Sequence, residues 1–200
     1  MNVVLTRRQF LAWSLVAAGQ PADPVRLVVR GSGEGSRGAA MALEEMEQTA
    51  VLLGRAIDRA PHARASVVDP AAATIASGGE TYRVAAGGAA RRRALAAWSA
   101  AHPGSAAHAA IEWHPALIRY GAEQLNQRYE RRFGAPMTAA EWIGWMAVKA
   151  AVDAGLRGVP LSRGRFDGHK GVALYFGADR TLVQPLCVVD GGGALLGLSA

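Results

Sequence analysis

Short apolar runs of strand type alternate with longer helical patterns along most of this chain, and this alternation restricts the possible fold more than any other feature. The run from Val25 to Val29 predicts a buried strand, and the segment from Ser36 to Leu53 carries apolar residues at helical spacing. Further strands are expected at 66–69, in "TYRVAAG" and in "AAIEW", with a helix between the last two. This order predicts an α/β fold with a mostly parallel sheet in a three-layer domain.

The second half of the chain is expected to contain two long helices and a closing β-hairpin. The segment 115–134 begins with proline and ends with glycine, which is typical of an amphipathic helix. In the next helix, 138–158, Thr138 and Glu141 have the spacing of a capping box. The C-terminal β-hairpin joins two strands of "GVALYFGADRTLVQPLCVVD" through a Gly-Ala-Asp-Arg turn. The stretch 70–79 fits either a short helix or a loop.

Composition excludes several classes of protein. The chain has 200 residues and 50% hydrophobic content, which fits one globular domain. The net charge is +6, and 20 of the 22 basic residues are arginine. Because alanine is also abundant, we attribute the arginine excess to the codon bias of a GC-rich gene and not to a binding function. We therefore expect no nucleic-acid partner. The single cysteine, Cys187, excludes an internal disulfide and a cysteine-based metal cage, and its apolar neighbours predict a buried strand position.

The N-terminus has the layout of an export signal. Arg7 and Arg8 precede Gln-Phe-Leu, as in a twin-arginine signal, and small residues follow at 16–18. The apolar run from Phe10 to Ala18 is too short to span a bilayer, so no stable membrane anchor is expected. We predict a signal peptide at 1–18, a single α/β domain at 19–200 and a periplasmic location. The alternative is an ordinary N-terminus with a chance arginine pair.

A glycine-rich turn follows the first predicted strand. Gly33, Gly35 and Gly38 spell G-x-G-x-x-G, the spacing of a dinucleotide-binding turn. Such a site also needs an acidic residue about 20 positions further on, at the end of the second strand. Asp69 ends that strand but lies 31 residues after Gly38, whereas Asp58 precedes the strand. We therefore expect the glycines to supply positive φ angles, with no pyrophosphate bound on them.

Other candidate sites have simpler interpretations. Three histidines, His102, His108 and His114, are spaced by six residues, which suits metal ligation neither on a helix nor on a strand. No G-x-S-x-G elbow occurs, so a hydrolase is unsupported. Trp142 and Trp145 lie at helical spacing and are expected in the core. We predict no metal site, no cofactor and no catalytic residue.

Three blocks of the chain carry patterns of a known family. They are "RGAAMALEEMEQTAVLLGR", "YGAEQLNQRYERRFGAPMTAAEWIGWMAVKAAVDAG" and "FDGHKGVALYFGADRTLVQPLCVVD". In this order they resemble the periplasmic solute-binding proteins of ABC transporters, in the branched-chain amino acid receptor class. The segments 113–115, 120–126 and 170–171 most resemble the branch associated with alcohol oxidation dependent on pyrroloquinoline quinone.

The resemblance implies a truncated type I periplasmic binding protein. In that family the loop after the first strand faces the ligand cleft, which here implies Ser32, Gly33 and Ser36 as ligand-binding residues. Ser36 is also expected to cap the following helix, whose N–H groups would meet a carboxylate or carbonyl of the solute. The chain is roughly half the usual length of the family, so the second lobe is expected to be largely missing.

The resulting hypothesis is an exported, non-enzymatic substrate-binding-like protein linked to periplasmic quinoprotein alcohol oxidation. Its expected partners are a small-molecule solute and an ABC permease or a quinoprotein dehydrogenase. One alternative is a protein-interaction remnant that binds no ligand. Another is a nucleotide-binding oxidoreductase.

Overall fold

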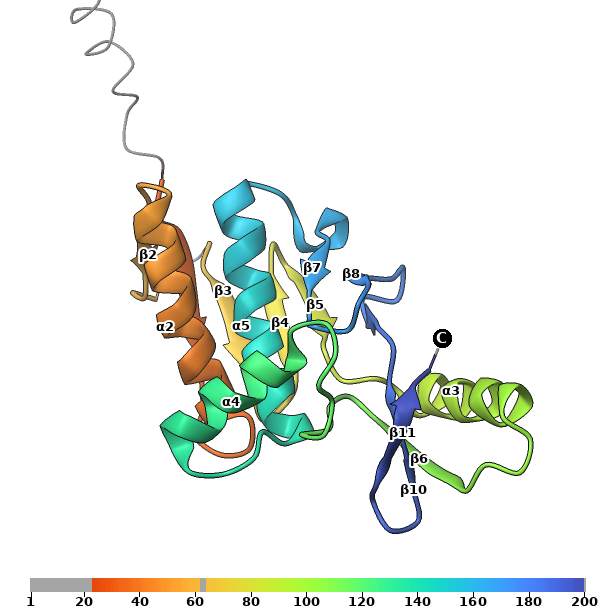
Figure 1. Ribbon diagram of the computed structural model, residues 1–200. Helices are drawn as coiled ribbons and strands as arrows, with labels where there is room; N and C mark the ends of the chain where they lie inside the picture. Colours follow the sequence, from red (N-terminus) through yellow and green to blue (C-terminus); the bar gives the residue numbers. More distant parts are fainter. Residues whose placement is uncertain (1–22, 62–63, 200) are drawn as a thin grey trace, which may run out of the picture.

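A computed structural model describes residues 23–61 and 64–199 as a mixed α/β protein (Figure 1). The predicted signal peptide, with Arg7 and Arg8, lies outside these residues. The α-helices of the described part are α2 (Ser36–Leu52), α3 (Gly88–Ala101), α4 (Ala122–Phe133) and α5 (Ala139–Arg157). None of them is long and apolar enough to cross a membrane.

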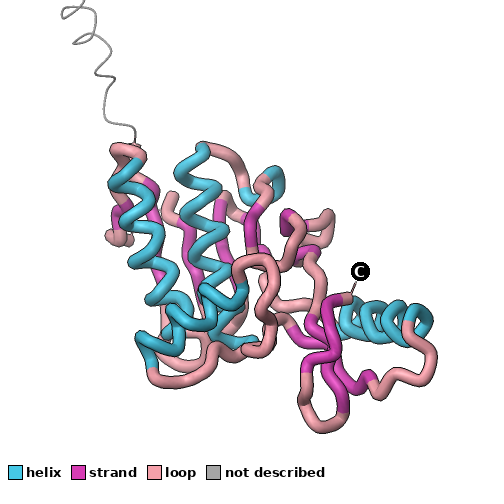
Figure 2. Tube along the Cα trace, viewed as in Figure 1, coloured by secondary structure: helices cyan, strands magenta, loops and turns pink. Residues whose placement is uncertain are grey.

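The main sheet has five strands in the order β2-β1-β3-β4-β5. Its strands are β1 (Val25–Val29), β2 (Ile57–Asp58), β3 (Ser66–Asp69), β4 (Thr74–Ser77) and β5 (Glu80–Arg83). Helix α5 packs on β1, β3 and β4, and α2 packs along α5. Figure 2 shows α2, α4 and α5 in front of this sheet and no described helix behind it.

The α/β class is confirmed, but the expected mostly parallel, three-layer sheet is not. Among the described strands of the main sheet, β1 pairs in parallel with β2 and with β3, whereas β3, β4 and β5 form an antiparallel meander. The connections explain the difference, because a parallel pair needs a long crossover and these strands are joined by tight turns. Gly78 and Gly79, with φ angles of 61° and 80°, form the two-residue turn between β4 and β5. The ambiguous stretch 70–79 is therefore mainly a turn and a strand.

A smaller unit lies to one side of the main body (Figure 1). It contains α3 and an antiparallel sheet in the order β11-β10-β6. Its strands are β6 (Ala107–Ile111), β10 (Cys187–Asp190) and β11 (Leu195–Leu198). The chain passes between the two units after β5, after β6 and before β10, so three segments join them.

A third sheet of three short antiparallel strands lies beside the main sheet. It contains β7 (Phe166–Asp167), β8 (Ala173–Phe176) and β9 (Leu182–Val183), preceded by the 3-10 helix η1 (Leu161–Arg163). The predicted hairpin is confirmed only in part: β8 pairs with β9 across the turn 177–180, but the expected second strand divides into β9 and β10, which belong to different sheets. A second hairpin, β10–β11, ends the described chain.

The helix predicted from residue 115 begins later than expected. Residues 115–121 form a loop, and α4 starts only after Tyr120 and Gly121, whose φ angles are 60° and 79°. The amide of Asn126 holds the loop by donating to the carbonyls of Pro115 and Leu117. These side-chain to backbone hydrogen bonds take the place of helical backbone hydrogen bonds in the loop. The prediction that the helix begins at Pro115 was therefore wrong.

The helix α2 begins where predicted but with a different cap. Gly35, at φ 82°, occupies the N-cap position, and no side chain caps the helix. The hydroxyl of Ser36 instead donates to the carbonyl oxygen of Gly33 at 2.7 Å. The predicted capping role of Ser36 was therefore wrong, because the positive φ of Gly35 turns the chain one residue earlier.

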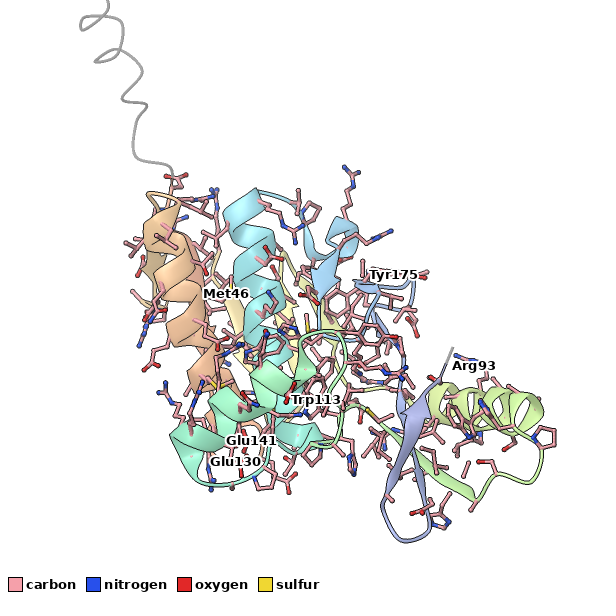
Figure 3. All side chains as sticks on the ribbon, viewed as in Figure 1. Met46, Arg93, Trp113, Glu130, Glu141 and Tyr175 are labelled. Carbon is pink, nitrogen blue, oxygen red and sulfur yellow. The ribbon has the colours of Figure 1, made fainter. Side chains whose placement is uncertain are left out.

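The core lies between the main sheet and helices α2, α4 and α5. Trp113 and Trp142 stack with ring centroids 5.7 Å apart, and Met46 packs into the same cluster (Figure 3). Trp142 and Trp145 are both buried, as the helical spacing predicted. Cys187 is also buried, in the predicted strand, now β10.

Candidate functional site

The candidate site is a hollow of about 440 Å³ at the amino-terminal ends of α2 and α5, which we call the α2–α5 hollow. It lies at the end of the main sheet where β1 leads into the glycine turn. Glu141, at the start of α5, marks its position next to α4 (Figure 3). The lining residues are Glu34, Arg37, Tyr129, Ala135, Pro136, Thr138, Ala139, Ala140 and Glu141.

Glycines allow the two helices to meet at this hollow. Gly31, Gly33 and Gly35 have φ angles of 85°, 137° and 82°, so the turn uses conformations that other residues rarely adopt. A Cβ on Gly38 would lie 1.8 Å from the carbonyl oxygen of Glu141. A Cβ on Gly144 would lie 2.0 Å from the carbonyl oxygen of Gly35. The G-x-G-x-x-G spacing therefore serves helix packing and turn geometry.

The carboxylate of Glu141 occupies the amino-terminal end of α2. Its Oε2 accepts the N–H of Gly38 at 2.6 Å, while the N–H of Glu141 donates to Thr138 Oγ1 at 3.3 Å. The Thr138 half of the predicted capping box is thus confirmed, but the Glu141 side chain reaches across to α2. A pyrophosphate on this glycine turn would have to displace that internal carboxylate, which argues against a dinucleotide site.

Tyr129 contributes a hydroxyl group that stays protonated. Burial of this side chain, followed by the negative charge of Glu141, raises its pKa to about 12, although Arg37 acts in the opposite direction. A protonated phenol donates a hydrogen bond. The hollow therefore combines the guanidinium of Arg37 and this donor with the carboxylates of Glu34 and Glu141.

The three ligand-binding residues predicted from sequence lie beside the hollow. Ser32 and Gly33 are exposed and Ser36 is half-buried, and none of them is among the lining residues. Glu34 and Arg37, from the same turn, do line it. Sequence reasoning missed these two because the resemblance pointed to hydroxyls, although charged residues beside a glycine turn were visible.

No protein-family model, curated protein or solved structure matches this chain. In residues 23–61 and 64–199, no group of three or more His, Cys, Asp or Glu side chains is placed to hold a metal ion. The assignment of the α2–α5 hollow as the candidate site is therefore argued from its geometry and its lining residues.

A second polar cluster lies inside the protein, where the smaller unit joins the main body. Glu112, 1% exposed, accepts the N–H of Ala86 at 2.8 Å and pairs with Arg91 through both carboxylate oxygens. Gln184 donates to the carbonyl of Val84 at 3.0 Å. These bonds connect the three segments that pass between the two units, and we call them the polar junction.

Lys170 completes the polar junction. Its Nζ donates to Gln184 Oε1 at 2.6 Å and to the Pro185 carbonyl at 2.9 Å, and lies 4.1 Å from the ring centroid of Trp142. Burial lowers the pKa of this amine to about 7, against the opposing effects of Cys187 and Glu112. Sequence reasoning did not identify this group as buried, because a lone lysine in a loop is usually exposed.

Proposed function

We propose that this protein is an exported, non-enzymatic solute-binding protein that holds a small solute in the α2–α5 hollow. The observation that supports this most is the position of the hollow. Ligands of open α/β sheets bind outside the carboxyl ends of parallel strands, and this hollow lies beyond the carboxyl end of β1, which pairs in parallel with β2 and β3. Three potential hydrogen-bonding groups, from Arg37, Tyr129 and Thr138, line it together with two carboxylates.

The charges of the hollow favour a solute with groups of both kinds. Arg37 suits a carboxylate, since a guanidinium can donate two parallel hydrogen bonds to it. Glu34 and Glu141 would repel a ligand that carried negative charge alone. We therefore propose a small carboxylate that also bears an ammonium or hydroxyl group, with its apolar part against Ala135 and Ala139.

A wider role follows from the resemblance to the solute-binding proteins of ABC transporters. The order of the three blocks that carry this resemblance supports a role in periplasmic quinoprotein alcohol oxidation, with an ABC permease or a quinoprotein dehydrogenase as partner. Export would use the twin-arginine route. Replacing Arg7 and Arg8 by lysine keeps the charge and is expected to abolish export, and undiminished periplasmic protein in that variant would contradict the route.

Solute binding is tested by the melting temperature of the mature protein in the presence of amino acids and hydroxy acids. A solute that binds only the folded state raises this temperature. We expect Arg37→Ala to remove the effect, Ser36→Ala to weaken it and Arg131→Ala, on an exposed face of α4, to preserve it. NAD, NADP and FAD are expected to give no shift. If no solute stabilises the protein, or if Arg37→Ala binds as well as the wild type, the proposal fails.

A second candidate function is a protein-interaction module that binds no solute. It is favoured by an apolar groove of about 490 Å³ between α3, the 115–121 loop and β11. Ile118 and Tyr120 line this groove with 67% and 54% of their surface exposed. Exposed apolar side chains of this size mark interaction surfaces when they are contiguous. Loss of dehydrogenase binding in Ile118→Lys, without any solute effect, would favour this function.

A further inference from the structure

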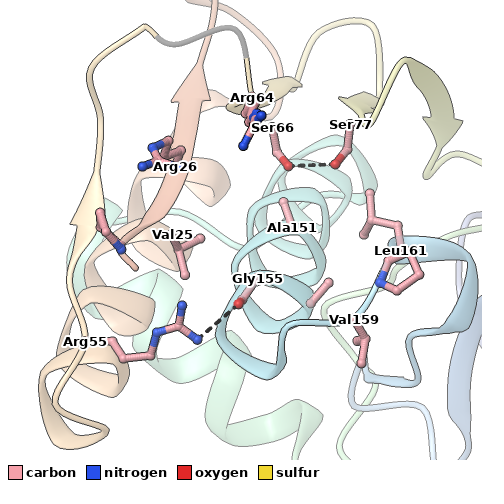
Figure 4. A pocket seen from close by; sticks show the side chains of 13 residues that line it. Val25, Arg26, Arg55, Arg64, Ser66, Ser77, Ala151, Gly155, Val159 and Leu161 are labelled. Carbon is pink, nitrogen blue, oxygen red and sulfur yellow. Dashed lines mark hydrogen bonds between the residues drawn. The ribbon is translucent and has the colours of Figure 1, made fainter. Parts of the chain in front are cut away.

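A second hollow lies at the opposite end of the main sheet from the α2–α5 hollow. It encloses about 190 Å³ beside the first residues of β1 and β3 and the last turn of α5. Figure 4 shows three arginines around it: Arg26 on β1, Arg55 after α2 and Arg64 before β3. We call it the arginine hollow. Its volume is several times the ~30 Å³ that one water molecule occupies in the liquid.

Three positively charged side chains line the arginine hollow. No salt bridge to any of the three arginines is formed within residues 23–61 and 64–199. Asp58 is the register partner of Arg26 between β1 and β2, and its Oδ1 accepts the N–H of Ala60. Asp23 contacts Arg55 through its backbone carbonyl. Three guanidinium groups around one small hollow create a positive potential that attracts an anion.

Arg55 is held in place by backbone carbonyls and retains an unused donor. Its Nη1 donates to the carbonyls of Gly155 and Leu156 at 3.3 and 2.6 Å, and its Nη2 donates to that of Asp23 at 2.5 Å. The contact to Gly155 is drawn in Figure 4. Its Nε is buried and has no acceptor in the described part of the chain. Because Arg55 donates hydrogen bonds to the carbonyl oxygens at the end of α5, these oxygens are already engaged and do not face the hollow as free acceptors.

Two hydroxyl groups lie on the wall of the hollow. Ser66 Oγ donates to Ser77 Oγ at 2.9 Å, as Figure 4 shows. One hydroxyl hydrogen is used in this bond, so the hydrogen of the other serine is available to a further acceptor. The rest of the wall is apolar and includes Val25 and Ala151.

We propose that the arginine hollow binds a small tetrahedral oxyanion, inorganic phosphate or sulfate. Guanidinium groups match the oxygens of such an anion, and the Ser66–Ser77 hydroxyl pair adds a neutral donor. Arg55 provides the fixed part of the site, whereas Arg26 and Arg64, which make no other polar contact in the described chain, close on the anion. This site is separate from the α2–α5 hollow and does not depend on the function proposed for it.

The proposal is tested by calorimetric titration of the folded protein with sodium phosphate and sodium sulfate, against sodium chloride of equal ionic strength. Arg26→Gln and Arg64→Gln are each expected to weaken phosphate binding roughly tenfold, the effect of losing one charge-assisted hydrogen bond. Arg92→Gln, which removes one exposed arginine from α3, is the matched control and should leave the affinity unchanged.

Arg64 is exposed, so its replacement is not expected to affect folding, and melting curves check this for each variant. The absence of phosphate and sulfate binding in the wild type at millimolar concentration would overturn the proposal. Binding that Arg92→Gln weakens as much as Arg64→Gln does would also overturn it, because the effect would then reflect net charge alone.

Discussion

At the level of single residues, Lys170 makes the stability of the protein depend on pH. An unfolded lysine holds its proton up to about pH 10.5, whereas burial lowers the folded pKa to about 7. Between these values the unfolded chain binds one more proton than the folded protein, so the free energy of unfolding rises with pH. Below pH 7 both states are protonated, and the cost of burying the charge is fully present.

We therefore predict that the free energy of unfolding rises by about 2 kcal/mol between pH 7 and pH 9 through Lys170. The measurement is urea denaturation of the wild type and of Lys170→Met across this range. The variant should lack the rise, whatever its overall stability, and the difference between the two curves isolates the contribution. Lys149→Met, at the other lysine of the chain, is the control and should retain it. Parallel curves for the wild type and Lys170→Met would refute the prediction.

Cys187 gives a second prediction at this scale. The thiol is buried in β10, and burial raises its pKa to about 11. A thiol reagent needs both access and a thiolate, so the native protein should remain unlabelled at pH 8. In urea, one equivalent should react at once. Fast labelling without denaturant would show that β10 is open to solvent.

At the level of elements, the contact between α2 and α5 depends on backbone proximity. Gly38 and Gly144 each lie where a Cβ would overlap a carbonyl oxygen of the other helix or its cap. We predict that Gly38→Ala and Gly144→Ala each lower the free energy of unfolding by about 3 kcal/mol, since the backbones must separate to make room. Chemical denaturation measures the change.

Gly88→Ala is the control for this pair. Gly88 is also a helical glycine, but a Cβ there would meet only an Arg92 side-chain atom at 3.5 Å, an ordinary contact. Its substitution should change the free energy of unfolding by no more than about 0.5 kcal/mol. If Gly38→Ala and Gly88→Ala changed the free energy of unfolding equally, the change would reflect helix propensity and not the close contact between α2 and α5.

The same elements show how far the sequence predicts this fold. Periodicity placed β1, α2 and α5 almost to the residue, because each has a regular apolar pattern and a clear glycine or Thr138 boundary. It misplaced the start of α4, because the Asn126 bonds that hold the preceding loop join residues nine and eleven apart. It also missed the antiparallel meander, since strand direction depends on turns and not on periodicity.

The candidate site was predictable only in part. The glycine turn and its positive φ angles follow from the sequence, and the structure has them at Gly31, Gly33 and Gly35. The contact of Glu141 with Gly38 joins residues 103 positions apart, so no local pattern could indicate it. Tyr129 is brought in by α4 in the same way. Sequence reasoning therefore located the turn but not the residues that line the hollow.

At the level of the whole molecule, two units are joined by three chain segments and the polar junction. The smaller unit consists of α3 and the three strands β6, β10 and β11. Glu112 is central here, because it is buried and bonds both the segment before α3 and Arg91 on that helix. Tight bonding of this kind restricts relative motion of the units, whereas a hinge would need it to loosen.

We predict that Glu112→Ala loosens the smaller unit while the main body stays folded. The substitution leaves the Ala86 N–H without an acceptor and Arg91 without its carboxylate. We expect a loss of about 2 kcal/mol in the stability of the smaller unit, a low value for a buried pair because solvent screens Arg91, whose side chain is 41% exposed. Amide hydrogen exchange should therefore quicken about thirtyfold in β6 and β10 and change little in β1 and β3. Glu44→Ala, which breaks an exposed pair with Arg132, is the control and should quicken neither region. Uniform acceleration in both sheets would instead mean that the two units unfold together and that the junction is part of a single cooperative core.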